Sequence, residues 1–398
     1  MKISSLTKKL LFTAGIVSFI RLGNFIPIPD IDQRYLVNIL NQNSTLKNFF
    51  NSDNLVLSVF SLGILPNINA SIMMQLLISA IPALEKLQKE EGETGRRQIK
   101  QYTRILTLVF AIVESSSIAI GLKPILFNWT TWLGLKIVIS LVVGSMVVLW
   151  LSDLITENGV GNGSSIIITL NILSALPATL NSTIKSSTTL SLAIAFIGFI
   201  LLITGIVYVQ EAVKVLPLIS AKQLTLKQGE TLDENLATLP LRLNQGGIMP
   251  LIFSSTFLSF ITIATNYIFT LNLLPSQLIQ PKVISLFYTV LNFIFIIVFS
   301  VFYSNLILNP KEISKDLNKM AVSIKNVRPG KETASFLKKT LTRLSLIGAL
   351  FLAFLVALPN LRSAYGFGAT SLLILVGVSV DTTRQIQTLI ISEKYEIE

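Results

Sequence analysis

The sequence predicts an all-α polytopic membrane protein with about ten transmembrane helices. Of its 398 residues, 51% are hydrophobic and only 13% are charged, which is more apolar surface than a soluble fold of this length could bury. The apolar residues form continuous runs rather than the alternating pattern of a membrane β-barrel. Most runs approach the roughly 20 residues that a helix needs to cross about 30 Å of hydrocarbon.

Ten apolar runs account for the ten expected helices. The first follows Lys8 and Lys9 and lacks a small-residue cleavage site, so we expect a retained helix rather than a removed signal peptide. The runs lie at about residues 10–29, 54–81, 104–122, 132–151, 164–180, 190–209, 246–271, 283–308, 341–359 and 366–383.

The second and seventh runs share an unusual turn. The sequences GILPNI, from residue 63, and GIMPLI, from residue 247, place a glycine three residues before a proline. Neither residue favours the middle of a helix, so each run is expected to contain or begin at a break. Interrupted apolar segments at corresponding places in two halves of a chain point to a pathway near the middle of the membrane.

The basic residues predict the orientation. Of the 32 Lys and Arg, 24 lie in the N-terminus, the loops 82–104, 210–245 and 309–343, and the C-terminal tail, against six in the alternating segments. The positive-inside rule then places both termini in the cytoplasm or its organellar equivalent, with an even number of helices. Because topology accounts for the net charge of +11, direct binding of nucleic acid is disfavoured.

The loop 309–343 carries nine of these basic residues, including Lys325, Arg328 and Lys331. That number exceeds what orientation requires. Two interpretations stay open at this point: a docking surface for an acidic or RNA-rich partner, and charge that faces lipid headgroups.

Missing residue types exclude most catalytic chemistry. The chain contains no Cys and no His, which excludes thiol nucleophiles, disulfides, haem ligation and ordinary zinc sites. No glycine-rich stretch leads into Gly-Lys-Ser/Thr, so no nucleotide-binding loop is present. We therefore expect no enzyme activity, no catalytic residues, no cofactor and no metal.

Ionisable groups are scarce within the apolar runs. Glu114 is the acidic residue that we place inside a run, with Asp153 and Asp381 near helix ends. We interpret Glu114 as a structural polar group paired with serines or a neighbouring subunit rather than as a proton relay. A small-solute secondary transporter also fits inverted repeats and broken helices, but it predicts buried charges that are lacking here. An apolar pathway suits a large, chemically varied solute better.

Several segments, in order along the chain, resemble the motifs of one family. They are RLGNFIPIP (21–29), VFSLGILPNINASIMMQLL (59–77), KLQKEEGETGRR (86–97) with YTR (102–104), ITENGVGNGSS (155–165), LPLRLN (239–244), VRPGKET (327–333) and FGATSLLI (367–374). The match is to the SecY family of protein-export channels and extends from about residue 8 to 396. The resemblance implies that the chain passes unfolded preproteins across a membrane and releases hydrophobic segments sideways into lipid.

The resemblance also implies two inverted, pseudo-symmetric halves, residues 1–185 with helices one to five and residues 186–398 with helices six to ten. A plug is expected near residues 53–62, before the break in the second helix. Its residues are Asp53, Leu55, Val56, Leu57, Ser58, Val59, Phe60, Ser61 and Leu62.

By the same resemblance, a ring of apolar side chains seals the waist of the channel around the passing polypeptide. The ring positions are Ile64, Ile68, Ser164, Ile168, Ile252 and Ile374. Ser164 departs from the usual apolar residue, which could leave the seal wetter or shift the contact to Ile167. The lateral gate is expected to include Gln75, Thr103 or Thr107, and Asn244.

The partners implied are SecE-like and SecG-like small membrane subunits, the motor ATPase SecA, translating ribosomes, signal peptides and lipid, without direct binding of nucleic acid or nucleotide. The docking contacts would be Arg328, Pro329 and Gly330, with Arg242 in the other basic loop. Lys outnumbers Arg 22 to 10 and Asn reaches 24, which resembles a plastid-encoded member. We expect an algal thylakoid membrane with both termini stromal, and a bacterial inner membrane as the alternative.

Overall fold

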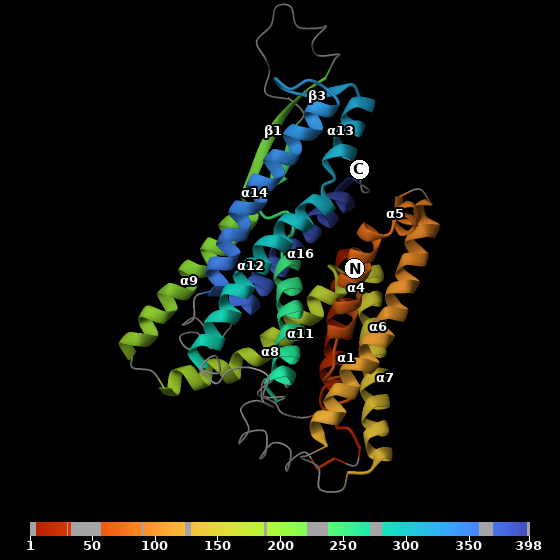
Figure 1. Ribbon diagram of the computed structural model, residues 1–398, viewed down its shortest axis with the longest axis vertical. Helices are drawn as coiled ribbons and strands as arrows, with labels where there is room; N and C mark the ends of the chain where they lie inside the picture. The colour runs from red at the N-terminus through yellow and green to blue at the C-terminus, as the bar shows by residue number, and fades with distance from the viewer. Residues whose placement is uncertain are drawn as a thin grey trace, which may run out of the picture. The chain divides into compact units, whose positions relative to one another are not determined.

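The computed structural model describes residues 5–29, 31–32, 57–89, 91–123, 129–186, 189–220, 238–270, 281–357 and 369–395. Within these ranges, each of the ten expected runs corresponds to one long helix (Figure 1). The helices are α1 (Ser5–Gly23), α4 (Leu65–Ala80), α6 (Gly92–Leu122), α7 (Thr131–Asn158), α8 (Gly163–Ser186), α9 (Thr189–Glu211), α11 (Met249–Thr270), α12 (Pro281–Ile307), α14 (Lys331–Ala357) and α16 (Ala369–Tyr395). The prediction of a mostly helical membrane protein is confirmed.

Length and apolar composition mark several of these helices as membrane spans in their own right. Among the described residues, four helical stretches meet both conditions, namely Gly92–Leu122, Thr131–Asn158, Leu286–Lys319 and Lys331–Ala357. The third of these stretches begins within α12 and continues beyond its end. α4 and the short helix α5 (Pro82–Lys89) meet the conditions only when taken together, as a pair with a bend of 107° between Leu65–Ala80 and Pro82–Gln88. Pro82 removes a backbone donor at this bend, which stops α4 from continuing.

Two helices extend well beyond their apolar runs. α6 begins at Gly92 and α14 at Lys331, each about ten residues before the apolar run predicted from the sequence. Charged groups support the polar part of α6, since Lys100 lies 3.3 Å from Asp153 and 3.0 Å from Glu157 of α7, and Arg104 also pairs with Asp153. Strong helix formers and ion pairs extend these helices where hydropathy alone ends them.

A small antiparallel sheet, which the all-α prediction did not include, joins the two basic loops. Strands β1 (Val213–Ser220), β2 (Thr238–Arg242) and β3 (Val322–Ile324) lie in the order β2-β1-β3. β1 pairs Val213 with Arg242 at one end and Ser220 with Val322 at the other. The sheet packs against α14 and the short helix α13 (Pro310–Lys319) through a cluster of leucines and one isoleucine, Leu216, Leu218, Leu241, Leu317, Ile324, Leu337 and Leu341.

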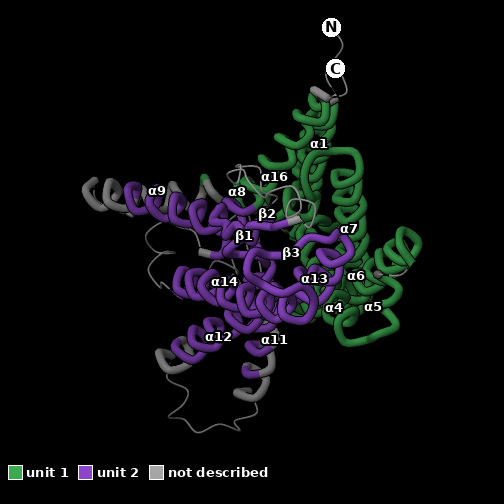
Figure 2. The backbone as a smooth tube through the Cα atoms, turned by 90° about the horizontal axis from the view of Figure 1, so that it is seen from above, with its two compact units in different colours: residues 1–181, 378–398 green, residues 182–377 purple. Residues whose placement is uncertain are grey.

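The chain forms two compact units, drawn green and purple in Figure 2. The first contains residues Met1–Asn181 and Val378–Glu398, and the second contains Ser182–Gly377. The second part of α16 therefore belongs with the first unit rather than with the C-terminal half. The inverted-repeat relation between halves 1–185 and 186–398 stays a prediction.

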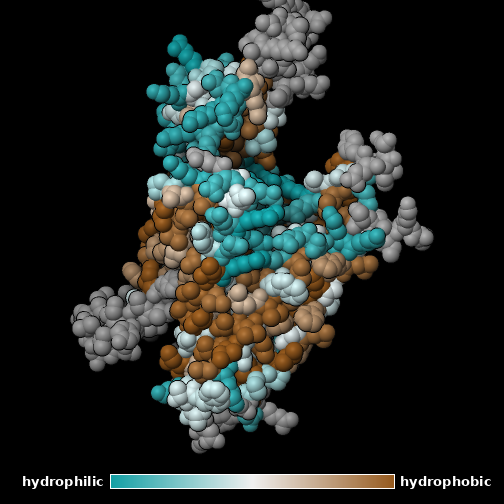
Figure 3. Space-filling model, turned by 90° about the vertical axis from the view of Figure 1, so that its right-hand side faces the viewer, coloured by the Kyte–Doolittle hydropathy of each residue, from teal (hydrophilic) through white to brown (hydrophobic). Residues whose placement is uncertain are grey.

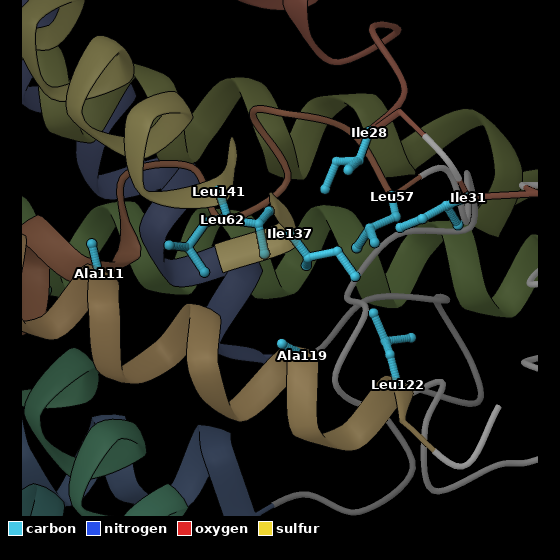
Figure 4. Close-up of a cluster of buried hydrophobic side chains, with 9 residues drawn as sticks. All are labelled: Ile28, Ile31, Leu57, Leu62, Ala111, Ala119, Leu122, Ile137 and Leu141. Atoms are coloured by element: carbon cyan, nitrogen blue, oxygen red, sulfur yellow. The ribbon is translucent and has the colours of Figure 1, made fainter. Parts of the chain in front are cut away.

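The core of the first unit fixes the chain that leads into α4. Leu57 and Leu62 are buried together with side chains from α6, α7 and the segment after α1, as Figure 4 shows. Ile28 N donates to Leu57 O at 3.1 Å, and Val59 N donates to Ile26 O at 3.0 Å. The segment 57–62 is thus held both by backbone hydrogen bonds and by apolar contacts.

Two glycines let this segment lie directly on helices. A Cβ added at Gly144 of α7 would lie 1.9 Å from Val59 O, and one at Gly23 would lie 2.1 Å from the Phe60 ring. Backbone can approach backbone this closely only where no side chain intervenes. Gly144 therefore determines how tightly residues 57–62 pack against α7.

The outer side chains of α6 form an apolar surface. Ile105, Val109 and Val113 are 61%, 49% and 60% exposed, whereas Thr107 and Ala111 on the other face are fully buried. On the face drawn in Figure 3, hydrophobic side chains gather in a broad region bordered by hydrophilic ones. Such exposure is expected where lipid rather than water is the solvent.

Candidate functional site

The two GI(L/M)P turns have the same geometry. Gly63 and Gly247 both have φ +58°, in the left-handed region that favours glycine. Each glycine lies in a turn that ends one residue before a helix, α4 at Leu65 and α11 at Met249, and each proline is the second helical residue. The prediction that both apolar runs begin their helices at a break is confirmed.

A side chain holds each of these turns through the glycine carbonyl. Ser145 Oγ of α7 donates to Gly63 O at 3.1 Å, and Asn244 Nδ2 donates to Gly247 O at 2.9 Å. The following isoleucine carbonyls, of Ile64 and Ile248, start the helical hydrogen-bond ladders of α4 and α11. Each turn thus fixes the direction of the helix that follows it.

Replacing Gly63 by alanine is expected to lower the free energy of unfolding by about 1 kcal/mol, since an L-residue is strained at φ +58°. Crowding contributes little, because the nearest atom to an added Cβ is 3.8 Å away. Gly63→Asn, which tolerates this conformation better, should cost less. Denaturation of the two detergent-solubilised variants measures their free energies of unfolding. Equal stability of wild type and Gly63→Ala would contradict the strained turn.

The first unit contains four of the predicted ring positions. Ile64 and Ile68 are one helical turn apart at the start of α4, with side chains 2% and 9% exposed. Ser164 and Ile168 are one turn apart at the start of α8, and both are half-buried. Asn67 Nδ2 donates to Ser164 Oγ at 3.4 Å, so the starts of these two helices lie side by side. Ile167, the alternative contact, is 1% exposed.

The second unit contains the other two ring positions. Ile252 lies on α11, one turn after Ile248, the residue that directly precedes this helix. Ile374 lies on α16, one turn before Gly377. An added Cβ at Gly377 would be 3.0 Å from Ile248 Cγ2, so α16 approaches α11 closely at this level. Ile374 is 8% exposed and Ile252 is half-buried. The complete six-residue ring stays a prediction.

The four predicted gate residues occupy different polar environments. Thr107 is fully buried and donates to Thr103 O at 2.8 Å, with Asn67 Oδ1 also within reach at 3.3 Å. Thr103 itself donates to Ile99 O at 2.9 Å. Gln75 Oε1 and Asn244 Oδ1 are buried and have no hydrogen-bond partner among the described residues.

Glu114 pairs with an asparagine, which corrects the expectation of serine partners. Asn69 Nδ2 of α4 donates to Glu114 Oε1 at 2.7 Å. The nearby Ser115 is fully buried and bonds instead to Ile112 O at 3.1 Å. The carboxylate therefore joins α4 to α6, which agrees with the structural interpretation of this residue.

The predicted plug is described only in part. Asp53, Leu55 and Val56 lie outside the described residues. Of the rest, Leu57, Ser58 and Leu62 are buried, Val59 and Phe60 are half-buried, and Ser61 is exposed. Ser58 forms an isolated bridge with Pro27. The described part is thus packed in the first unit.

The predicted docking residues lie on the sheet and on the turn that leads into α14. Arg328 and Pro329 are exposed, and Gly330 has φ +93°. Two hydroxyls hold this turn, as Thr333 Oγ1 donates to Arg328 O and Ser314 Oγ donates to Gly330 O, each at 2.7 Å. Arg242, at the end of β2, is exposed as well. Both basic loops therefore contribute to one folded element within the second unit.

Comparison with known proteins decides the family. The SecY family model matches residues 58–383. The chain belongs to the SecY family. Its relatives include the protein translocase subunits SecY of Synechocystis, Guillardia theta and Porphyra purpurea, each 42% identical, with 99%, 100% and 99% of this chain and 94%, 97% and 98% of the relative covered. SecY is the protein-conducting channel subunit of the Sec translocase, and this chain is a multi-pass membrane protein of that kind.

Solved structures share the SecY fold at low sequence identity. One is a SecY channel whose plug domain is described as stabilising the closed state, with a TM-score of 0.68, 18% identity and coverage of 99% of this chain and 94% of that chain. Another is Sec61 of a canine ribosome-channel complex, with a TM-score of 0.64, 17% identity and the same coverage. These likenesses agree with the SecY fold assignment.

Sequence reasoning missed several residues that hold the site together. Asn67, Asn69 and Ser152 form hydrogen bonds between helices, and Ser145 joins α7 to the turn before α4. Asn67, Asn69 and Ser145 are polar residues within an apolar run and Ser152 directly follows one, which is the signal that could have revealed them, because unpaired polar groups are costly in a membrane.

Proposed function

We propose that polypeptides cross the membrane through an apolar waist formed by the isoleucines at the starts of α4 and α11, together with Ile168 and Ile374. The observation that carries this proposal is the shared turn. Gly63 and Gly247 both have φ +58°, so α4 and α11 begin after turns of the same backbone geometry. Apolar walls bind no particular side chain strongly and lose water when empty, so they suit a varied solute and resist ions.

The lateral gate is proposed to lie along α4, α6 and the start of α11. Gln75 and Asn244 each hold a buried acceptor without a partner among the described residues. An unpaired buried acceptor destabilises a packed state by about 1–3 kcal/mol. A helix interface that contains such unpaired groups should open more readily than one in which every polar group is hydrogen-bonded. A signal peptide's apolar core would leave through this wall because lipid removes it from water.

A small-solute transporter, the alternative from sequence alone, gains no support from the site. Glu114, the glutamate within the apolar run 104–122 of α6, is bonded to Asn69. Among the described residues, no group of three or more acidic or other metal-ligating side chains comes together. The SecY assignment also accounts for the docking element, which a small-solute transporter would not need.

The partners proposed are SecE-like and SecG-like membrane subunits, with the SecA motor or a ribosome docking on the Arg328 turn. The support for docking is geometric: Arg328 is an exposed arginine on a turn held at two carbonyls, and this turn follows β3 of the same sheet whose strand β2 ends at Arg242. A channel of this fold, canine Sec61, is described in complex with a ribosome.

Arg328→Glu is expected to lower motor-driven translocation by at least about tenfold, because reversing the charge replaces attraction by repulsion at a docking contact. The variant should fold normally, since Arg328 is exposed. Proteoliposomes that contain the channel with its partner subunits, supplied with SecA and a radiolabelled preprotein, measure the rate. Lys86→Glu, an exposed reversal on α5, serves as the control. Equal rates for Arg328→Glu and wild type would remove Arg328 from the docking site.

The membrane is proposed to be an algal thylakoid, with a bacterial inner membrane as the alternative. Cyanobacterial and algal relatives both match at 42% identity. The choice of the thylakoid over a bacterial membrane therefore rests on the amino-acid composition. Lys exceeds Arg 22 to 10 and Asn reaches 24. Both termini are proposed to be stromal because they lie on the same side of the membrane as the basic loops, which the positive-inside rule places in the stroma.

A further inference from the structure

Four polar side chains of the first unit, on α6, α4, α8 and α7, form a continuous chain of contacts. Thr107 Oγ1 of α6 lies 3.3 Å from Asn67 Oδ1 of α4. Asn67 Nδ2 donates to Ser164 Oγ of α8 at 3.4 Å, and Ser164 Oγ lies 3.0 Å from Ser152 Oγ of α7. Asn67 is therefore the link between a gate helix and a ring position.

Close backbone packing fixes the far end of this chain. An added Cβ at Gly163 would lie 2.0 Å from Ser152 O, so the start of α8 rests directly on α7. Gly163 N also donates to Thr156 Oγ1 at 2.9 Å. Ser152 is 2% exposed. The Ser164 hydroxyl consequently faces partners on α4 and α7, which a branched apolar side chain could not bond.

We propose that Asn67 and Ser164 are positioning residues, a polar clasp that holds the ring side chains of α4 and α8 in register and ties them to the gate helix α6. The proposal rests on the channel function proposed above. Asn67 immediately precedes Ile68 and Ser164 lies one turn before Ile168, so the clasp acts at the level of the ring. Hydrogen bonds between membrane helices are retained because neither group finds water in the hydrocarbon.

The clasp reverses the expectation for the serine at position 164. If Ser164 were only a polar gap in an apolar ring, Ser164→Ile would seal the idle channel better and lower its ion leak. If Ser164 is part of the clasp, the same change leaves the Asn67 amide without its α8 partner. The helices then separate and the leak rises.

The test compares ion conductance of idle channels in planar bilayers with preprotein translocation by the same complexes. Ser164→Ile and Ser164→Ala should each raise the leak roughly three- to tenfold, and Asn67→Leu should raise it as much. Adding Ser164→Ala to Asn67→Leu should raise the leak by less than the product of the two single effects, because the Asn67–Ser164 bond is already lost and only the Ser152 contact remains to be removed. Ser164→Thr, which keeps a hydroxyl, should stay within about twofold of wild type.

Ser165→Ala is the matched control, since it removes a hydroxyl from the next position of α8 and leaves the Ser164 contacts intact. A leak that is unchanged or lower in Ser164→Ile, or additive effects of the Ser164 and Asn67 changes, would overturn the clasp. Failure of the wild-type complex to translocate any preprotein would instead overturn the channel function. The two failures are therefore distinguishable.

Discussion

Ile68→Asn is expected to open the idle channel to ions. Ile68 is 9% exposed beside the turn that starts α4. A polar amide at this position would hold water in the waist and lower the barrier to wetting by an amount on the order of 1–3 kcal/mol. A barrier change of that size corresponds to a rise in leak of roughly five- to 160-fold. Conductance of idle channels in planar bilayers measures it.

Ile68→Leu is the matched control, because it keeps the volume and the apolar character of the side chain. Its leak should stay close to that of wild type. The corresponding change in the second unit, Ile252→Asn, should raise the leak as Ile68→Asn does if both residues belong to one ring. A leak unchanged by both asparagine variants would exclude these isoleucines from the seal.

Gly144→Ala is expected to dislodge residues 57–62 and to destabilise the first unit by about 3 kcal/mol. An added Cβ would lie 1.9 Å from Val59 O and 2.7 Å from Val59 C. Because these are backbone atoms, no rotamer change relieves the overlap, and the segment must move away from α7. Denaturation of the solubilised complex measures the stability, and limited proteolysis near residue 57 reports displacement of the segment.

Gly15→Ala controls for the loss of a helical glycine as such. Among the described residues, no atom outside the adjacent backbone of α1 lies within 4 Å of the Cβ that this change adds, and alanine favours the helix over glycine by about 1 kcal/mol. Gly15→Ala should therefore be neutral or stabilising. If Gly144→Ala behaves in the same way, the segment does not rest on α7 as described.

The elements that hydropathy alone determines could be predicted from the sequence. Each of the ten apolar runs corresponds to a helix among the described residues, because run length and continuous burial in lipid dominate helix formation. The Gly63 and Gly247 turns were also predictable, since a glycine and a proline at fixed spacing restrict the backbone locally. Both signals depend only on residues close together in the chain.

Features that depend on distant residues were missed. Strand β1 contains Pro217 and pairs with β3 about a hundred residues later, so nothing local indicated the sheet. The same is true of Asn67, whose partners Thr107 and Ser164 are 40 and 97 residues away. Glu114 was recognised as a structural group, but its partner Asn69 is 45 residues distant and was not.

Cross-linking from the waist tests the central claim most directly. A photoreactive residue placed at position 64, 68 or 252 of the assembled channel would be irradiated while a secretory chain is stalled during translocation. The same residue at Ile105, which is 61% exposed on α6, serves as the lipid-facing control. We expect the stalled chain to be captured from all three waist positions and not from position 105. Capture of lipid alone from positions 64, 68 and 252 would contradict a polypeptide pathway through this part of the protein.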